Sequence, residues 1–175
     1  PAGVAMRRRW ILAAALLALT IAAFWKVVEL PFISYDDPDY VTGNGPVRRG
    51  LTLQSIDWAI GATHGANWFP LTWMSHMLDV SLFGLDPGGH HAVNLALHCL
   101  NVVLLFLLFS RLTGEAWRSA FLAVFFAVHP LRVESVAWVA ERKDVLSASF
   151  WLLTTHSYCA WIRNRTRPRY MAVVA

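Results

Sequence analysis

The feature that most constrains the fold is a series of long apolar runs bounded by basic residues. Residues 10–28 form the first run, directly after Arg7, Arg8 and Arg9. A helix of about 20 apolar residues crosses a hydrocarbon core about 30 Å thick. Further spans are predicted over residues 91–112, 117–139 and 145–162, and another begins near residue 170. The pattern predicts an all-α, polytopic membrane protein.

The composition supports this interpretation. The chain is 57% hydrophobic and only 15% charged, whereas soluble domains contain about 25% charged residues. The net charge is +4, but the arginines lie at the ends of apolar runs and do not form one basic face. This arrangement is typical of membrane orientation signals and argues against a nucleic-acid partner.

The basic residues also predict a topology. The three arginines at residues 7–9, the turn from Arg111 to Arg118 and the cluster from 163 to 169 are assigned to the cytoplasm. Residues 29–90 then form a long first outer loop. A signal peptide would also begin this way, but Trp25–Lys26 is a poor cleavage site, which favours an uncleaved helix.

Acidic residues stand where the outer loop leaves the membrane. Asp36 and Asp37 lie between Pro31 and Pro38, so we expect them on irregular backbone at the interface. Further along the loop, apolar spacing in residues 51–60 predicts a short amphipathic helix. Trp68 and Trp73 are predicted to be interfacial belt residues.

A second polar segment, residues 129–144, separates two apolar runs; we call it the hinge. Ionisable groups at such a place are costly in hydrocarbon and indicate function by default. A carboxylate there can act as a general base or hold a metal, and arginine binds phosphate bidentately. The ionisable side chains of the hinge are His129, Arg132, Glu134, Glu141, Arg142, Lys143 and Asp144.

Three stretches carry a family resemblance: Tyr35–Val41, Asn67–Asp79 and His129–Leu146. They resemble bacterial membrane proteins that join a glycosyltransferase-like module to C-terminal tetratricopeptide repeats. These proteins are similar to the transmembrane-and-TPR O-mannosyltransferases and, more distantly, to the protein O-mannosyltransferase group of the GT-C fold. The resemblance covers roughly residues 7 to 171.

The resemblance implies an inverting glycosyltransferase that uses a polyprenyl-phosphate-linked sugar and a hydroxyl on a protein or glycan acceptor. It also implies a bacterial inner membrane, with the N-terminus in the cytoplasm and the site facing the periplasm. By this similarity, Asp36 or Asp37 is the base toward the acceptor. The full expected set is Asp36, Asp37 and Glu134 as catalytic residues, Arg132, Arg142 and Lys143 as donor-phosphate ligands, and His129, Asp144, Trp68 and His76 as site wall.

Several of these residues also have a purely structural interpretation. The acidic pair could be a solvated helix stop, and Glu134 could simply pair with Arg132 or Arg142. His129–Pro130 could end the third helix, and residues 142–144 could be an interfacial anchor with an N-cap aspartate. Asn94, His98 and Asn101 are expected to form interhelical hydrogen bonds.

Metal binding is an open possibility. His90 and His91 beside His76 and Asp79 could hold a divalent metal, but no fixed ligand spacing supports it, so no metal ligand is assigned. Cys99 and Cys159 belong to no metal or redox motif and are predicted to be small buried hydrophobes.

Two rival functions are a non-catalytic membrane anchor, which serves repeat-mediated protein interactions, and a transporter. Because residues precede Met6 and the chain stops inside an apolar segment, we expect a longer protein with its repeats beyond residue 175. Residues 1–175 alone are expected to show no transferase activity.

Overall fold

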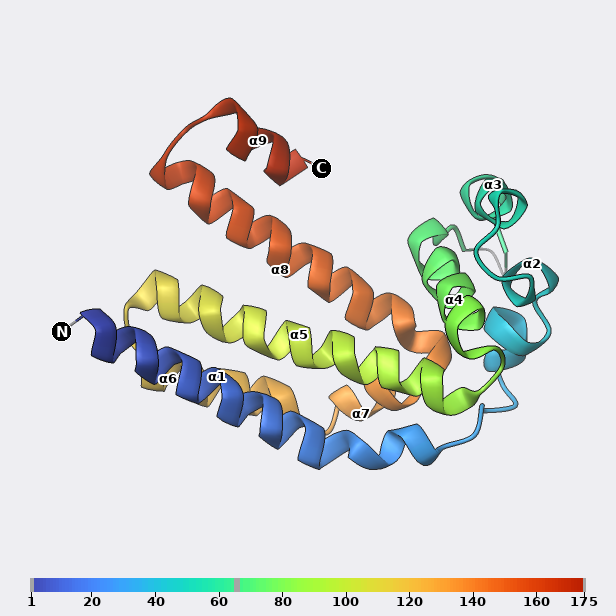
Figure 1. Cartoon of the computed structure of the whole chain (residues 1–175), viewed down its shortest axis with the longest axis horizontal. Coiled ribbons are helices and arrows are strands. Elements are labelled where there is room, and N and C mark those ends of the chain that lie inside the picture. Colours follow the sequence, from blue (N-terminus) through green and yellow to red (C-terminus); the bar gives the residue numbers. More distant parts are fainter. Residues whose placement is uncertain (1, 65–66, 175) are drawn as a thin grey trace. The chain divides into compact units, whose positions relative to one another are not determined.

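The computed structural model describes residues 2–64 and 67–174, and the ordered elements in these ranges are helices (Figure 1). The chain divides into two compact units. The first comprises Pro1–Ala23, Leu97–Arg132 and Ser147–Ala175, and the second comprises Phe24–Ala96 and Val133–Leu146. The helical elements are α1 (Ala2–Phe24), η1 (Trp25–Glu29), η2 (Pro38–Thr42), α2 (Gly45–Arg48), α3 (Leu53–Gly61), α4 (Pro70–Phe83), α5 (Pro87–Thr113), α6 (Ala116–Val128), α7 (Arg132–Ala137), η3 (Val139–Glu141), α8 (Arg142–Arg163) and α9 (Arg167–Val174).

The first unit is built from α1, α6 and the parts of α5 and α8 that belong to it. Small side chains on α6 allow close helix packing, and Ala123 and Ala127 are buried with Leu16, Val102 and Phe106 in one apolar cluster. This cluster joins α1, α5 and α6, which run side by side in Figure 1.

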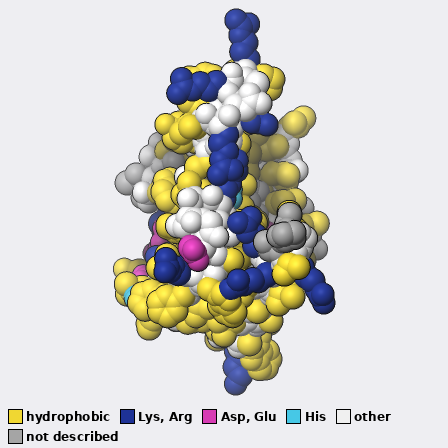
Figure 2. Space-filling view, turned by 90° about the vertical axis from the view of Figure 1, so that its left-hand side faces the viewer, with side chains coloured by type: hydrophobic (Ala, Val, Ile, Leu, Met, Phe, Trp, Pro, Cys, Tyr) yellow, Lys and Arg dark blue, Asp and Glu magenta, His cyan; other side chains and the backbone are white. Residues whose placement is uncertain are grey.

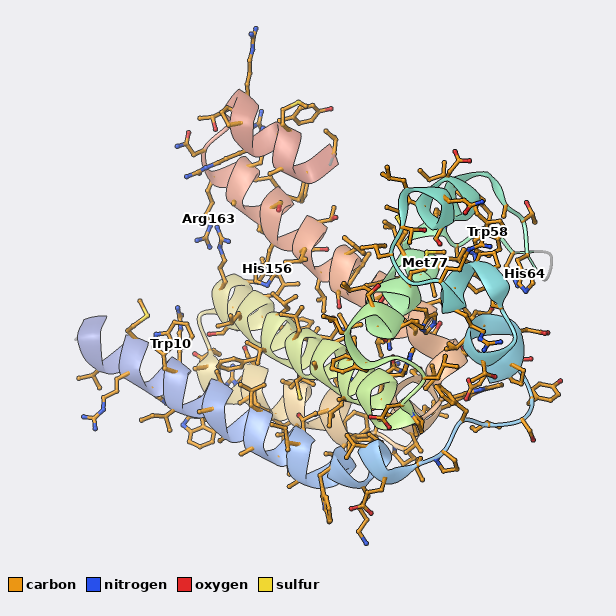
Figure 3. All side chains as sticks on the ribbon, turned by 45° about the vertical axis from the view of Figure 1, so that its right-hand side comes forward. Trp10, Trp58, His64, Met77, His156 and Arg163 are labelled. Carbon is orange, nitrogen blue, oxygen red and sulfur yellow. The ribbon has the colours of Figure 1, made fainter. Side chains whose placement is uncertain are left out.

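Polar side chains connect α5 to its neighbours in this unit. The His98 ring lies 3.0 Å from the carbonyl oxygen of Ala127, and Ser149 donates to the Asn101 amide oxygen over 2.7 Å. His156 extends from α8 toward α5, with Nε2 2.9 Å from the Leu104 carbonyl oxygen (Figure 3). The expected interhelical hydrogen bonds of His98 and Asn101 are therefore confirmed.

Basic side chains gather at one end of this unit. Arg9 donates to the carbonyl oxygen of Ser110, and Arg163 donates to that of Arg111. The beginning of α1 and the ends of α5 and α8 therefore lie together, and Figure 2 shows basic side chains across this face. The clustering agrees with the predicted placement of the basic turns on one side of a membrane.

Two helices, Met6–Glu29 and Pro87–Thr113, are long and apolar enough to cross a membrane. The segment predicted as a third span, residues 117–139, is not one continuous helix, because α6 ends at Val128 after 13 residues and α7 begins at Arg132. A helix of that length is about 20 Å long, too short for the hydrocarbon core. Pro130 explains the end: it disfavours helical backbone at the preceding residue, and His129 has φ −62° and ψ 132°.

The predicted outer loop contains most of the second unit and is largely helical. Asn44 and Thr52 accept hydrogen bonds from backbone N–H groups as N-caps of α2 and α3. The helix expected over residues 51–60 is confirmed as α3. Trp73 is completely buried beside Met77, so its expected belt position is wrong, whereas Trp68 is 60% exposed.

Candidate functional site: a buried polar cluster beneath the hinge

A cluster of polar side chains in the second unit, all buried except the half-buried Ser75, comes from three helices. Its members are Ser75, His76 and Asp79 of α4, His90 and Asn94 of α5, and Arg142 of α8. Helical spacing explains the grouping, because residues three or four apart share a face. His76 and Asp79 are separated by three positions, and His90 and Asn94 by four. Arg142 is the first residue of α8, so the hinge delivers it to the cluster.

Arg142 is completely buried and cross-links all of these elements. Nη2 donates to Asp79 Oδ2 over 2.7 Å and to the His90 carbonyl oxygen over 2.9 Å. Nη1 donates to Ser75 Oγ over 2.8 Å, and Nε donates to Asn94 Oδ1. Four donated bonds fix the guanidinium geometry, so a phosphate ligand here would have to displace protein groups.

The Asp79–Arg142 ion pair is shielded from water, with Asp79 only 2% exposed. Burial raises the pKa of Asp79 above its usual 3.8, and the nearby Arg142 guanidinium opposes this rise. Burial also lowers the pKa of His76 well below 6.5, an effect that the positive charge of Arg142 reinforces. Near neutral pH the cluster therefore holds an uncharged His76 beside an ion pair.

Asn94 connects the cluster to the backbone of the hinge. Its amide donates to the carbonyl oxygens of Val136 and Trp138 over 3.4 and 3.0 Å. These carbonyls lie where α7 ends and η3 begins, so they lack the helical partners they would have inside a helix. The expectation that Asn94 forms an interhelical hydrogen bond is confirmed, and its role is to hold this bend.

Asp37 joins the two stretches that the sequence analysis singled out. Its carboxylate accepts the Ile33 N–H at Oδ2 over 2.7 Å and the Ala140 N–H at Oδ1 over 3.0 Å. Asp37 is completely buried, and this burial raises its pKa above 3.8. The hydrogen bonds place the acidic pair against the second half of the hinge, as expected from the topology.

More accessible groups lie along the rim of this contact. Asp36 is half-buried. Lys143 Nζ lies 2.6 Å from Glu141 Oε1 and 5.7 Å from the centre of the Tyr40 ring. Burial raises the pKa of Tyr40, and the positive charge of Lys143 opposes this effect. The rim therefore presents an acid, a phenol and a cation on neighbouring segments.

The other predicted site residues are more scattered. Glu134 is exposed on α7, and among the described residues the ion-pair partner of Arg142 is Asp79. Asp144 accepts a hydrogen bond from Ser135 over 3.3 Å. Trp68 donates to the Ile60 carbonyl oxygen, away from the hinge.

Arg132 and His129 belong to the first unit. There the Arg132 guanidinium lies 4.8 Å from the Phe126 ring centre. His129 Nδ1 accepts the Leu131 N–H, a local bond that fits its interpretation as part of the helix end.

Sequence reasoning assigned no site role to Ser75, Asp79, His90 and Asn94. A signal was present, because Ser75, His76 and Asp79 fall on one face of a single helical turn within an otherwise apolar stretch. A polar face in apolar surroundings needs a buried partner. Arg142 is that partner. It lies far from α4 along the chain, so the sequence pattern did not reveal the pairing.

Comparison with known proteins gives a consistent picture. The chain is 34% identical to mouse protein O-mannosyl-transferase TMTC1 over 159 residues, 83% of this chain and 16% of the relative. It is 35% identical to human TMTC4 over 171 residues, covering 86% and 23%. It is 31% identical to Drosophila melanogaster Tmtc1 over 156 residues, covering 85% and 18%.

These relatives are named protein O-mannosyl-transferases, so the chain has a glycosyltransferase-like sequence. Its two helices that are long and apolar enough to cross a membrane support a membrane protein. It spans about a fifth of the length of the curated relatives. No family model and no solved structure matches the chain.

Proposed function

We propose that this chain is part of a membrane glycosyltransferase that transfers a sugar from a polyprenyl-phosphate-linked donor to a hydroxyl group. The observation that carries the proposal is the similarity to protein O-mannosyl-transferases over more than four fifths of the chain. The contact between Asp37 and Ala140 supports it, because it joins the acidic pair to the hinge. The site is proposed to face the non-cytoplasmic side of the membrane, which is the periplasm if the protein resides in a bacterial inner membrane.

Asp36 is the proposed general base toward the acceptor. A general base must reach the proton that it removes, and Asp36 is half-buried whereas Asp37 is enclosed. Both Asp37 oxygens already accept backbone N–H groups. Asp37 is therefore proposed as the positioning residue that fixes Asp36 against the hinge.

Lys143 is the proposed cation toward the donor phosphate, with Arg142 as the residue that positions it. Lys143 is 28% exposed and adjoins Arg142, whose guanidinium is bound by Ser75, Asp79 and Asn94. No role at this site is proposed for Arg132 or His129, which belong to the other unit.

The reaction follows from these roles. Asp36 removes the proton of the acceptor hydroxyl as its oxygen attacks the anomeric carbon of the sugar. The bond from that carbon to the donor phosphate oxygen breaks, the configuration inverts, and the electron pair leaves with the polyprenyl phosphate. The ammonium of Lys143 stabilises the charge that develops on this leaving group.

The test is sugar transfer by the full-length protein in membranes, with a polyprenyl-phosphate sugar as donor. Asp36→Asn should lower turnover by about 10²-fold or more, the usual effect of losing a general base. Asp39→Asn is the matched control, because Asp39 is an exposed acid of the same segment. Undiminished turnover in Asp36→Asn would refute the assigned role. If the protein carrying both Asp36→Asn and Asp37→Asn still complemented a deletion strain, a non-catalytic membrane anchor would become the better description.

A further inference from the structure

Three cluster residues place metal-ligating atoms close together in the second unit. One ligand atom each from His76, Asp79 and His90 lies within 4.8 Å of the others, and all three residues are buried. His91, which the sequence also offered, is not part of this group. Two imidazoles and one carboxylate form a donor set that suits Zn²⁺ and related transition metals better than Mg²⁺ or Ca²⁺, which prefer oxygen ligands.

The hydrogen bonding of His90 orients it as a ligand. Its Nε2 lies 3.2 Å from the carbonyl oxygen of Gly84. A carbonyl only accepts, so Nε2 carries the proton, and the Nδ1 lone pair of the neutral ring faces Asp79 Oδ2 at 3.4 Å. Metal-bound histidines commonly donate their second ring nitrogen to a backbone carbonyl in this way. A lone pair facing a carboxylate needs a cation or a second proton between them.

His76 supplies an independent observation. It is completely buried, and neither of its ring nitrogens has a hydrogen-bond partner among the residues that the structure describes. Its ring stacks beside that of His90, with the ring centres 6.2 Å apart. Burying an imidazole without a partner is costly. Coordination of a metal by one of its nitrogens would remove part of this cost.

We propose that His76, Asp79 and His90 bind one Zn²⁺-type cation. Ligand atoms about 2.0–2.1 Å from a tetrahedral metal are about 3.3 Å apart, and His90 Nδ1 and Asp79 Oδ2 already have this spacing. The ligand atom of His76 lies within 4.8 Å of the other two, so the His76 side chain must move closer to complete the site. Three protein ligands leave a fourth position open, as in catalytic zinc sites. The adjacent Arg142 guanidinium favours an anion such as hydroxide there.

The site does not depend on the proposed transferase activity. Because its ligands are buried, the metal is expected to enter as the protein folds and to remain bound during purification. Metal content of the purified protein is therefore the direct measurement, and it requires no knowledge of the donor or acceptor.

The experiment uses the full-length protein, purified with a histidine-free affinity tag from cells grown with added Zn²⁺. Elemental analysis should give about one zinc per chain for the wild type and a small fraction of that for His76→Gln and His90→Gln. His64→Gln is the control: His64 lies in the same unit, against the rings of Trp58 and Trp73, outside the cluster (Figure 3). Wild-type metal content in both cluster variants would overturn the proposal.

A measurement on the wild type alone keeps the test decisive if the variants fail to fold. Protein produced with Co²⁺ should show the visible d–d absorption of a four-coordinate site, and X-ray absorption should show only nitrogen and oxygen ligands. Wild-type protein without stoichiometric metal would refute the site and favour a doubly protonated His90 paired with Asp79. Sulfur ligands would move the metal to Cys99 or Cys159.

Discussion

The buried ion pair between Asp79 and Arg142 allows a quantitative prediction for the stability of the second unit. Across 2.7 Å, two unit charges attract by about 6 kcal/mol at an effective dielectric constant of about 20. Desolvation of the two buried charges offsets much of this attraction, and burial is the largest cause of the raised pKa of Asp79. The pair therefore contributes little net stability, but removing one member leaves the other charge buried and uncompensated. Asp79→Leu should therefore destabilise the protein by about 3–5 kcal/mol.

The measurement is equilibrium unfolding of the full-length protein in mixed micelles, with a chelator present so that bound metal does not contribute. Glu141→Gln is the control, because it breaks the more exposed Glu141–Lys143 pair, in which the side chains are 17% and 28% exposed. That pair should contribute about 0–1 kcal/mol. The double variant Asp79→Leu with Arg142→Met should be more stable than either single variant. Additive losses, or a loss in Asp79→Leu no greater than in Glu141→Gln, would refute this account.

Two further predictions concern Asp37 and Gly50. Because burial raises the pKa of Asp37 above 3.8, the folded state binds this proton more tightly, so stability falls as the pH rises from about 4 through the folded pKa. Asp37→Asn should flatten that part of the pH profile of unfolding, although His91 also influences this carboxylate; an unchanged slope would contradict the assignment. Gly50 has φ +74°, and an added Cβ would lie 2.6 Å from Ser81 Oγ, which accepts the Leu51 N–H. Gly50→Ala should therefore lower the unfolding free energy by about 1–3 kcal/mol, whereas Gly45→Ala, where an added Cβ meets nothing within 4 Å, should have little effect.

The helices were easier to predict than the contacts of their polar residues. Apolar runs and basic flanks located α1 and α5, because membrane-length helices are specified by local composition. The sequence placed the end of the third apolar run at Val128, where α6 ends, but the predicted span was extended through the hinge to Val139, whereas the structure begins a separate helix at Arg132. Trp73 was assigned to an interface on residue type alone. Only tertiary structure shows that it packs against Tyr40, with ring centres 4.8 Å apart.

In the candidate site, too, the general arrangement was predictable from the sequence and the individual polar contacts were not. The sequence indicated that the acidic pair and the hinge lie together, and the Asp37–Ala140 hydrogen bond confirms this. The sequence did not indicate which charged side chains are buried. Arg142 and Lys143 are neighbours with the same formal charge, yet one is completely buried and the other is 28% exposed. That difference depends on the first turn of α8 meeting α4 and α5, a long-range contact that no local pattern encodes.

Three attachments hold the second half of the hinge: Asp37 to the Ala140 N–H, Asn94 to the carbonyls of Val136 and Trp138, and Arg142 to Asp79. Each attachment uses a buried side chain on at least one end, so their combined loss would free the hinge backbone. In the proposed mechanism, the enclosed polar residues therefore act through geometry, whereas the more accessible Asp36 and Lys143 are the groups proposed to meet a substrate. If this division is correct, Asp36→Asn should reduce turnover without changing unfolding, and Asp79→Leu should change both.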